Sequence, residues 1–399
     1  MQRLPSSGRN IYSDMKNIRL KDIAIVTSGN SAPQNDKMFE DGIYPFVRTS
    51  DVGRVHLSAS FTKPEDYLNE TGIKGMKLFP KDSILFPKSG ASTLLNHRVL
   101  LGEDSYVVSH LAVIVPDKSK VVPLYLYYYT TRIDAGELVN DRAYPSLKTS
   151  ILEQVSLNLP SLAEQERIVT ELDLLAGIID KQKAQLKELD NLAQSIFYDM
   201  FGDPVENEKG WEVKTFGEVG TLQRGAGLSK KDLTECGYPC ILYGQIHTRF
   251  GEFTNSHIAC IPTELVHTAK IAHHNDVIMA ITSEDVEGSC KSTAWMGDYD
   301  IAIGSDAAIY HHTQNGIYVS FYTKTKAFYN EKEKYARGFK VTHISTKEIS
   351  QIPLPIPPMS LQNSFSQKIQ SIESQKAAIN RSIAETQKLF DYTMDKYFG

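Results

Sequence analysis

The sequence has little cysteine, no long apolar run and no large excess of either charge. Its four cysteines (Cys236, Cys240, Cys260 and Cys290) stand among 399 residues, and all four lie in the second half. No stretch approaches the ~20 uncharged apolar residues that a membrane-spanning helix needs. The first 17 residues carry two arginines but no apolar core, which is not the pattern of a secretory signal. These absences predict a cytoplasmic protein.

The cysteines do not favour a metal site. Cys236 and Cys240, with His273 and His274 further along, are conceivable zinc ligands, but their spacing fits zinc motifs poorly. We therefore expect buried or reduced thiols and no metal site in this chain.

The charge balance is close to neutral for a chain of this size. There are 43 Lys and Arg against 48 Asp and Glu, a net charge of −5, and no basic tail. Any binding of nucleic acid must therefore depend on local clusters of basic and polar residues.

The sequence repeats itself at about half its length. Phe201-Gly202 recurs as Phe398-Gly399, 197 positions later, and the same offset carries Gln165 onto Gln362. A repeat on this scale indicates two copies of one structural unit. Two similar surfaces related by an approximate two-fold axis suit a target that itself has two halves.

Each copy begins with a mixed globular domain and ends with a long helix. Short β-branched segments bounded by Gly, Pro, Asp or Ser predict strands, and aromatic stretches at 124–131 and 318–335 predict helices, so each domain is α/β or α+β. The predicted parts are an N-terminal segment (1–17), a first domain (18–160), a first helix (161–202), a linker (203–212), a second domain (213–358) and a second helix (359–399).

The two helical segments carry apolar residues in alternating steps of four and three. This spacing is typical of a coiled-coil seam and favours an antiparallel pair of helices, each roughly 55 Å long. The domains would then lie at opposite ends of a rod, in a nearly circular organisation. The alternative is that each helix packs on its own domain. The predicted seam residues are Ile168, Leu172, Leu175, Ile179, Leu186, Leu189, Ile196, Phe365, Ile369, Ile372, Ile379, Ile383 and Phe390.

Three motifs carry a resemblance to a known family. Leu159 to Ile168 reads Leu-Pro-Ser-Leu-Ala-Glu-Gln-Glu-Arg-Ile, 199–204 reads Asp-Met-Phe-Gly-Asp-Pro, and 210–212 reads Gly-Trp-Glu. With the alternation of domains and helices, the whole chain resembles the specificity (S) subunit of Type I restriction-modification systems, the HsdS family. The second copy departs from the first motif, because it lacks the Glu166-Arg167 pair.

The resemblance implies two target recognition domains that bind a bipartite, asymmetric site in double-stranded DNA. It implies that the helices set the distance between these domains and dock two methyltransferase (M) subunits, which methylate adenine N6. Restriction or motor (R) subunits join this core. S-adenosylmethionine, Mg and ATP would belong to those partner subunits, and this chain would need no cofactor of its own.

The sequence contains no catalytic motif for these reactions. An Asn/Asp-Pro-Pro-Tyr/Phe methyl-transfer motif and a G-x-x-x-x-G-K-S/T phosphate loop are both absent. Glu284, Asp285 and Glu287 beside Lys291 faintly suggest a nuclease metal site, but the first copy has no matching group. A solvated loop is the simpler interpretation, and no catalytic residue is predicted.

Basic and polar residues in corresponding loops are the candidates for DNA contact, because such side chains bind phosphates and base edges. Each one taken singly is also compatible with an ordinary solvated surface residue. The first-domain candidates are Arg48, Thr49, Ser50, Lys74, Lys77, Lys81, Lys88, Ser89, Arg98, Arg142, Tyr144 and Lys148. The second-domain candidates are Tyr243, Gln245, Lys291, Arg337, Lys340 and Thr342.

Two other functions remain open at this point. A self-contained DNA methyltransferase or endonuclease would carry its own recognition domains, although the missing motifs argue against it. A coiled-coil adaptor that binds only protein is compatible with the helices. The loops differ in residue type between the copies while the helices keep their pattern, which favours a DNA site that is not a palindrome.

Overall fold

The computed structural model describes residues 16–55, 58–336 and 342–399. The chain forms two compact units, one made of the chain up to Lys181 with Ser382–Gly399, the other of Gln182–Arg381. This division cuts through both long helices. Each unit therefore contains one mixed α/β domain and half of each helix, and the units are called unit 1 and unit 2 below.

The domain of unit 1 is built on a five-stranded sheet and a three-stranded sheet. The five-stranded sheet has the order β2-β9-β6-β7-β4, antiparallel except for the β4–β7 pair. Its strands are β2 (Ala24–Ser28), β9 (Leu111–Pro116), β6 (Ile84–Pro87), β7 (Val99–Leu101) and β4 (Ser58–Phe61). The smaller sheet has the order β5-β3-β8, with β5 at Asp66–Leu68, β3 at Tyr44–Val47 and β8 at Tyr106–Val107.

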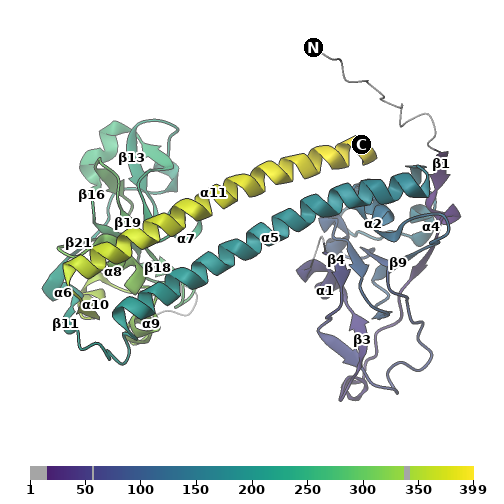
Figure 1. Ribbon diagram of the computed structural model, residues 1–399, viewed down its shortest axis with the longest axis horizontal. Coiled ribbons are helices and arrows are strands. Elements are labelled where there is room, and N and C mark those ends of the chain that lie inside the picture. The colour runs from purple at the N-terminus through teal and green to yellow at the C-terminus, as the bar shows by residue number, and fades with distance from the viewer. Residues whose placement is uncertain (1–15, 56–57, 337–341) are drawn as a thin grey trace, which may run out of the picture. The chain divides into compact units, whose positions relative to one another are not determined.

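One face of the five-stranded sheet is covered by helices. Helix α2 and the first part of α5 lie beside this sheet (Figure 1). Ile84 and Phe86 on β6 share an apolar cluster with Tyr125 of α2 and with Ile168 at the start of α5. Helix α2 begins with Pro123, whose fixed φ and missing N–H suit a first helical position. The helices are α1 (Thr49–Arg54), α2 (Pro123–Thr131), α3 (Ala135–Leu138) and α4 (Thr149–Leu152), with short 3-10 turns at Leu20–Asp22, Asp36–Met38 and Ala91–Leu95.

The domain of unit 2 repeats this topology. Its five-stranded sheet has the order β12-β21-β17-β19-β14, which matches the first sheet strand for strand, and its second sheet has the order β15-β13-β20-β16. The strands are β12 (Gly220–Arg224), β21 (Ala307–His312), β17 (Val277–Ala280), β19 (Ser292–Trp295), β14 (Phe253–Thr254), β15 (Ala259–Ile261), β13 (Tyr238–Ile241), β20 (Ile301–Ile303) and β16 (Lys270–Ala272).

The helices of unit 2 also follow the first copy. Tyr318 of α8 and Ile349 of α10 share an apolar cluster with Phe365 of α11, on the face of the sheet that α2 covers in unit 1. The helices are α6 (Phe216–Val219), α7 (Tyr243–Thr248), α8 (Gly316–Tyr322), α9 (Lys326–Glu333) and α10 (Thr346–Ile349), with 3-10 turns at Lys230–Asp232 and Thr263–Thr268.

A two-stranded ladder joins the first and last strands of each domain. In unit 1, β1 (Lys16–Arg19) pairs antiparallel with β10 (Ser156–Leu159). In unit 2, β11 (Glu212–Thr215) pairs in the same way with β23 (Pro353–Ile356). Prolines are tolerated in β23 because this ladder has only two strands and leaves their nitrogen positions unpaired.

The two long helices are α5 (Leu162–Phe201) and α11 (Met359–Phe398). Helix α5 ends at Gly202, whose φ of +76° is the left-handed conformation usual after a helix C-terminus. Six predicted seam residues are buried: Ile168, Leu172, Ile179, Phe365, Ile369 and Ile372. The other seven are half-buried: Leu175, Leu186, Leu189, Ile196, Ile379, Ile383 and Phe390.

A buried glutamine attaches the start of each long helix to its domain. In unit 1, the Gln165 side chain accepts a hydrogen bond from the Val122 N–H (2.8 Å) and donates one to the Pro160 carbonyl (2.9 Å). In unit 2, Gln362 accepts from the Asn315 N–H (3.0 Å) and donates to the Pro357 carbonyl (2.8 Å). Both side chains are fully buried. The repeat at offset 197 therefore repeats one structural feature, the attachment of a domain to the start of its long helix, which is called the joint below.

Among the described residues, no helix combines the length and the apolar character needed to cross a membrane.

Candidate nucleic-acid interface

Two loops meet at one end of the sheet in unit 1. Loop A1 (88–96) follows β6, and loop B1 (134–147) follows α2. They are joined where Ser89 bridges Ser146 and where the Gly90 N–H donates to the Pro145 carbonyl (3.0 Å). A cavity of about 350 Å³ lies between them, lined by Gly90, Ala91, Leu94, Arg142, Ala143, Tyr144 and Pro145.

The side chains at this junction are polar, basic and aromatic. Tyr144 is 83% exposed, which is unusual for so large a ring. Arg142 is exposed and pairs with Glu137 at 2.9 Å. Ser89 Oγ lies 2.7 Å from His110 Nδ1, and Lys88 beside it is half-buried. An exposed aromatic ring beside cationic groups and hydroxyls is suited to contact with bases and phosphates.

The corresponding loop of unit 2 is loop A2 (282–290), which follows β17. Its first residues form strand β18 (Thr282–Ser283), which pairs with β22 (Thr342–His343). Thr282 faces His343 in this ladder, as Ser89 faces Ser146 in unit 1, and each pair follows an equivalent backbone hydrogen bond, from Ile344 to Ile281 and from Leu147 to Lys88. Both loops end in a non-glycine residue with positive φ, Asn96 at 54° and Cys290 at 59°. The backbone framework of the two loops is therefore shared.

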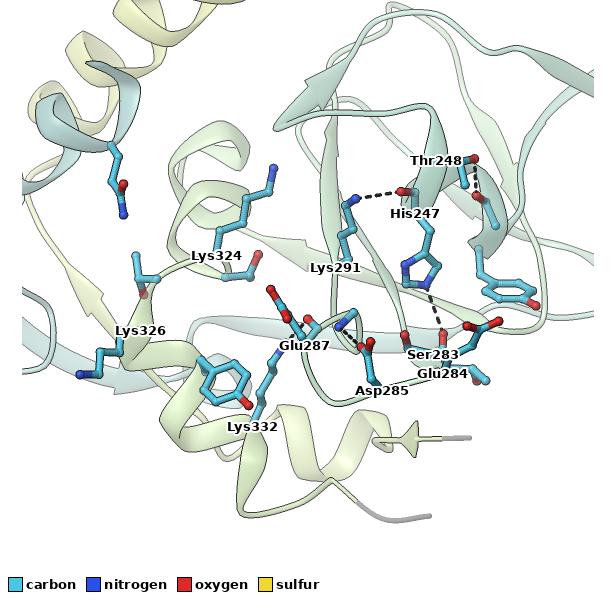
Figure 2. A pocket seen from close by; sticks show the side chains of 18 of the residues that line it. His247, Thr248, Ser283, Glu284, Asp285, Glu287, Lys291, Lys324, Lys326 and Lys332 are labelled. Carbon is cyan, nitrogen blue, oxygen red and sulfur yellow. Dashed lines mark hydrogen bonds between the residues drawn. The ribbon is translucent and has the colours of Figure 1, made fainter. Parts of the chain in front are cut away.

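Loop A2 forms one wall of a cavity of about 1310 Å³ in unit 2 (Figure 2). Helix α7, the α8–α9 turn and the last part of α5 supply the other walls. Four lysines and three acids line it: Lys291, Lys324, Lys326, Lys332, Glu284, Asp285 and Glu287. Tyr198, Tyr243 and Tyr329 add aromatic rings. The walls offer both donors and acceptors of hydrogen bonds, in contrast to the mainly basic junction of unit 1.

Comparisons with known proteins agree with this geometry. A family model described as Type I restriction modification DNA specificity domain matches residues 12–191. The Type I restriction enzyme MjaIX specificity subunit of Methanocaldococcus jannaschii is 26% identical over 54% of this chain, and the match spans about half (54%) of that protein. The MjaVIII specificity subunit of the same organism is 21% identical, over 92% of this chain and 88% of its own length.

The crystal structure of a Type I restriction-modification S subunit from M. genitalium has the same fold. It superimposes with a TM-score of 0.57, covering 100% of this chain and 99% of that one, at 14% identity. The family model and these relatives make the chain similar to the specificity subunits of Type I restriction-modification systems. Its relatives are named as specificity subunits, which agrees with the expectation that the chain is not the catalytic subunit.

The prediction that Arg98 contacts DNA is wrong, because the side chain is fully buried. Its guanidinium donates to the carbonyls of Thr130 (3.2 Å), Ile133 (3.0 Å) and His97 (2.7 Å), and lies 3.2 Å from the centre of the Phe86 ring. Burial lowers its pKa to about 9, so it stays charged at neutral pH. Its role is internal.

Thr342 is also a wrong prediction, since its side chain is buried in the β18–β22 ladder with 6% of its surface exposed. Arg337 and Lys340 lie outside the described residues. Gln245 is half-buried and its side chain accepts from the Leu242 N–H at 3.0 Å, so it caps α7. Lys291 Nζ donates to the His247 carbonyl at 2.8 Å, and Tyr243 is 41% exposed.

Of the other first-domain candidates, some have side chains held by contacts within the domain, and the rest are exposed. Arg48 pairs with Asp66 and lies over the rings of Phe39 and Phe46, both 5.3 Å away. Thr49 is half-buried. The remaining candidates have exposed side chains: Ser50, Lys74, Lys77, Lys81 and Lys148. The backbone N–H of Lys77 and that of Lys81 donate to Asn30 and Asp104, which lie outside loops A1 and B1.

The acidic group in loop A2 has a structural use. Asp285 accepts from the Gly288 N–H at 2.7 Å and so closes a turn. Among the described residues, no group of three or more His, Cys, Asp or Glu side chains is arranged to hold a metal ion. All four cysteines are free thiols, and burial raises the pKa of Cys240 and Cys290 to about 12.

Sequence reasoning missed Lys332, which lies 4% exposed on α9 beneath loop A2. A signal was present, because Lys332 is four residues after the buried Phe328 and so falls on the buried face of a helix.

Proposed function

We propose that this chain is a specificity subunit that binds double-stranded DNA at a bipartite, asymmetric site, with one half-site for each domain. The observation that carries the proposal is a duplicated framework with unlike loops. Loop A1 begins with Lys88-Ser89-Gly90, whereas loop A2 begins with Thr282-Ser283-Glu284. Because bases are distinguished by the donors and acceptors that meet their edges, unlike loops on one framework suit two different half-sites.

We assign the DNA contacts to exposed and half-buried groups at the two junctions. In domain 1 these are Lys88, Ser89, Arg142 and Tyr144, which loops A1 and B1 bring together. In domain 2 the wall of the large cavity supplies Tyr243 and the outward side chains of loop A2. Lys74, Lys77, Lys81 and Lys148 would contribute phosphate contacts, which add affinity without sequence preference.

The two long helices would pair as an antiparallel coiled coil that fixes the distance between half-sites. Contacts inside each unit support this arrangement. In unit 1, Arg167 near the start of α5 donates to Tyr397 Oη near the end of α11 (2.9 Å). In unit 2, Lys376 in the first half of α11 pairs with Asp190 in the second half of α5 (2.7 Å). The start of one helix thus meets the end of the other, which implies a nearly circular organisation of domains and helices.

The chain would act together with two M subunits and with R subunits. An exposed apolar strip in unit 1 offers them a surface: Leu174 (64%), Ile178 (44%), Leu389 (52%) and Tyr392 (67%). Leu174 and Ile178 are one turn apart on α5, as are Leu389 and Tyr392 on α11, which is the spacing that a partner helix covers. Methylation of adenine N6, with S-adenosylmethionine, Mg and ATP, is assigned to the partners, and a cytoplasmic location stays a prediction.

Mapping N6-methyladenine across the genome, in cells with and without this gene, tests the proposal. We expect one bipartite motif to lose its methylation in the deleted cells. Retention of every modified adenine would contradict the proposed function. A purified chain that methylates DNA without M subunits would instead support the self-contained methyltransferase, and a chain whose M complex ignores DNA in a gel shift would support the protein adaptor.

A second experiment tests the helices as a ruler. Inserting four residues at matching positions of α5 and α11 lengthens each helix by about 6 Å, close to two base pairs of DNA. We expect the recognised site to gain about two base pairs of spacer, with unchanged half-sites. An unaltered spacer would contradict the ruler.

A further inference from the structure

In each domain, one buried cation connects loop A1 or loop A2 to the helices that pack on the five-stranded sheet. In unit 1 the cation is Arg98, and in unit 2 it is Lys332; both are at least 96% buried. Arg98 is fully buried inside the domain, and Lys332 lies at the wall of the large cavity with only 4% of its surface exposed. Burial of a charge is costly unless hydrogen bonds compensate it, so each of these residues needs a reason to be where it is.

Arg98 connects both ends of loop A1 to helix α2. It follows the loop in the chain, and its guanidinium lies on the ring of Phe86, which precedes the loop. Its N–H groups reach the carbonyls of Thr130 and Ile133, at and just beyond the end of α2. A helix C-terminus presents unpaired carbonyls and partial negative charge, which favour a cation.

Lys332 makes the reverse connection in unit 2. It lies on α9, and its ammonium donates to two carbonyls inside loop A2, those of Glu287 (2.8 Å) and Ser289 (2.6 Å). Figure 2 shows Lys332 extending from α9 toward the part of the loop that carries Glu287. The two carbonyls are two residues apart, so one ammonium fixes the curvature of the loop between them.

The two cations are alternatives for one task. Ala294 pairs with Val277 in the second sheet as Leu100 pairs with Ile84 in the first, which places Ser292 at the position of Arg98. Ser292 is buried and only its hydroxyl reaches α8 and Thr323. Strand β19 therefore has a serine where unit 1 has Arg98, and helix α9 supplies the cation instead, as Lys332. Both units thus connect the loop to the helices through a buried cation. In unit 1 a guanidinium beside the loop donates to carbonyls at the end of a helix, whereas in unit 2 an ammonium on a helix donates to carbonyls of the loop.

We propose that Arg98 and Lys332 are positioning residues that hold loops A1 and A2 in the shape that distinguishes one half-site from other sequences. The inference rests on the proposed function. A loop that is ordered before binding loses less conformational entropy on DNA, and its donors and acceptors are already set for particular base edges. Contacts with phosphates come from exposed lysines and do not need this order.

The test replaces Lys332 in the complete complex with M subunits and measures binding to three duplexes. The first carries the site found by methylation mapping, the second has a mutated first half-site, and the third has a mutated second half-site. For Lys332→Met we expect discrimination against the third duplex to fall by about tenfold or more, the size of one or two lost base-specific contacts. Discrimination against the second duplex should stay unchanged.

Two variants separate positioning from a loss of charge or of folding. Lys332→Arg keeps a cation with donors and should retain most of the discrimination. Lys334→Met removes an exposed lysine of the same helix end, which pairs with Glu331, and should change nothing. Unchanged discrimination by domain 1 reports that the complex is intact, and a denaturant unfolding curve like that of the wild type reports that domain 2 is folded. If Lys332→Met does not fold, the milder Lys332→Gln, which keeps a hydrogen-bond donor, takes its place.

The outcomes separate the inference from the proposed function. A wild-type complex that discriminates against neither mutated duplex contradicts the proposed function. A wild-type complex that discriminates against both, with a folded Lys332→Met or Lys332→Gln complex that does so equally well, overturns the positioning role. An equal loss against both half-sites would also overturn it, because the proposal assigns Lys332 to loop A2 alone. The mirror result, loss at the first half-site, is expected for Arg98→Lys.

Discussion

The two joints between domain and helices share a backbone framework, and both have an apolar core, but they differ in the groups that complete them. In unit 1, Arg167 of α5 donates to Glu164 (2.6 Å), Glu171 (3.2 Å) and Tyr397 Oη (2.9 Å). Arg132 of the domain pairs with Asp395 near the end of α11. The charged groups are partly exposed, whereas Tyr397 is 8% exposed and buried. The joint of unit 1 is therefore finished by a network of charges at the surface.

In unit 2 the equivalent place is filled by aromatic rings. Phe197 and Phe201 of α5 lie 5.6 and 5.3 Å from the ring of Phe365 on α11, and Phe197 stacks on Phe321 of α8 at 5.1 Å. These rings lie in the apolar core of the unit. The second copy lacks the Glu-Arg pair of the first, and apolar burial replaces it.

The difference teaches which parts of the repeat the joint requires. The buried glutamines, Gln165 and Gln362, keep the same partners in both copies, whereas the groups around them have diverged. Buried polar groups must be satisfied, while a surface ion network and an aromatic cluster are interchangeable ways to add stability. The comparison predicts that the two joints respond differently to mutation, salt and acid.

Phe197→Ala should give the largest effect on stability. Phe197 is 1% exposed and contacts five aromatic rings, so its removal should lower the free energy of unfolding by about 3–5 kcal/mol. Denaturant unfolding of the purified chain measures this. The matched control is Leu192→Ala on the same helix, which is 47% exposed. Similar losses for both variants would contradict the assignment of an aromatic core to this joint.

Gln165→Leu and Gln362→Leu should have intermediate and nearly equal effects. Each change leaves a partly buried N–H and a buried carbonyl without this partner, which costs about 1–3 kcal/mol for each group. The same unfolding assay applies, with the exposed Gln185→Leu as control. A marked inequality between the two variants would show that the shared geometry does not have a shared energetic role.

Arg167→Met should have a small effect that depends on salt. Partly exposed ion pairs contribute about 0.2–1 kcal/mol each and are screened by salt. We expect the loss of stability in low salt to shrink at 1 M NaCl, because the Debye length is then about 3 Å. Phe197→Ala should show no such salt dependence. A loss that stays constant with salt would mean that Arg167 acts through packing on Tyr397.

The smallest expected effect is a change with pH in the stability difference between the wild type and Arg167→Met. The hydrogen bond from Arg167 holds the pKa of Glu164 below its usual 4.5. A lowered pKa stabilises the folded chain above pH 4.5, and this contribution is lost as the pH falls through the folded value. The difference between wild type and Arg167→Met should therefore disappear in that acidic window. A difference that grows on acidification would contradict the pairing.

The long helices and the repeat were the parts most open to prediction from sequence. A spacing of 3.5 residues persists over each whole helix, so the expected range 161–202 corresponds to α5 at Leu162–Phe201. The detail of the seam was less accessible. The sequence pattern selected Ile196, whereas Phe197 is more deeply buried, because α5 packs against α8 as well as α11. Period alone does not reveal a second packing face.

The recognition loops were predictable in position but not in side-chain direction. Loops that differ between copies pointed to one end of each sheet, where Ser89 meets Ser146 in unit 1, and their contact with DNA stays a prediction. Arg98 looked like one more basic group in that region. Its partners are carbonyls 32 and 35 residues further along the chain, and no local pattern indicates such contacts. The same holds for Lys332, whose acceptors lie 45 and 43 residues earlier.

The paired terminal strands of each domain have a consequence for how new variants arise. Lys16 faces Leu159 across β1 and β10, and Glu212 faces Ile356 across β11 and β23. A segment whose entrance and exit are adjacent behaves as a cassette: it can be exchanged for a homologous segment while the chain on either side stays where it was. Recombination within one gene segment would then create a new combination of half-sites in a single step.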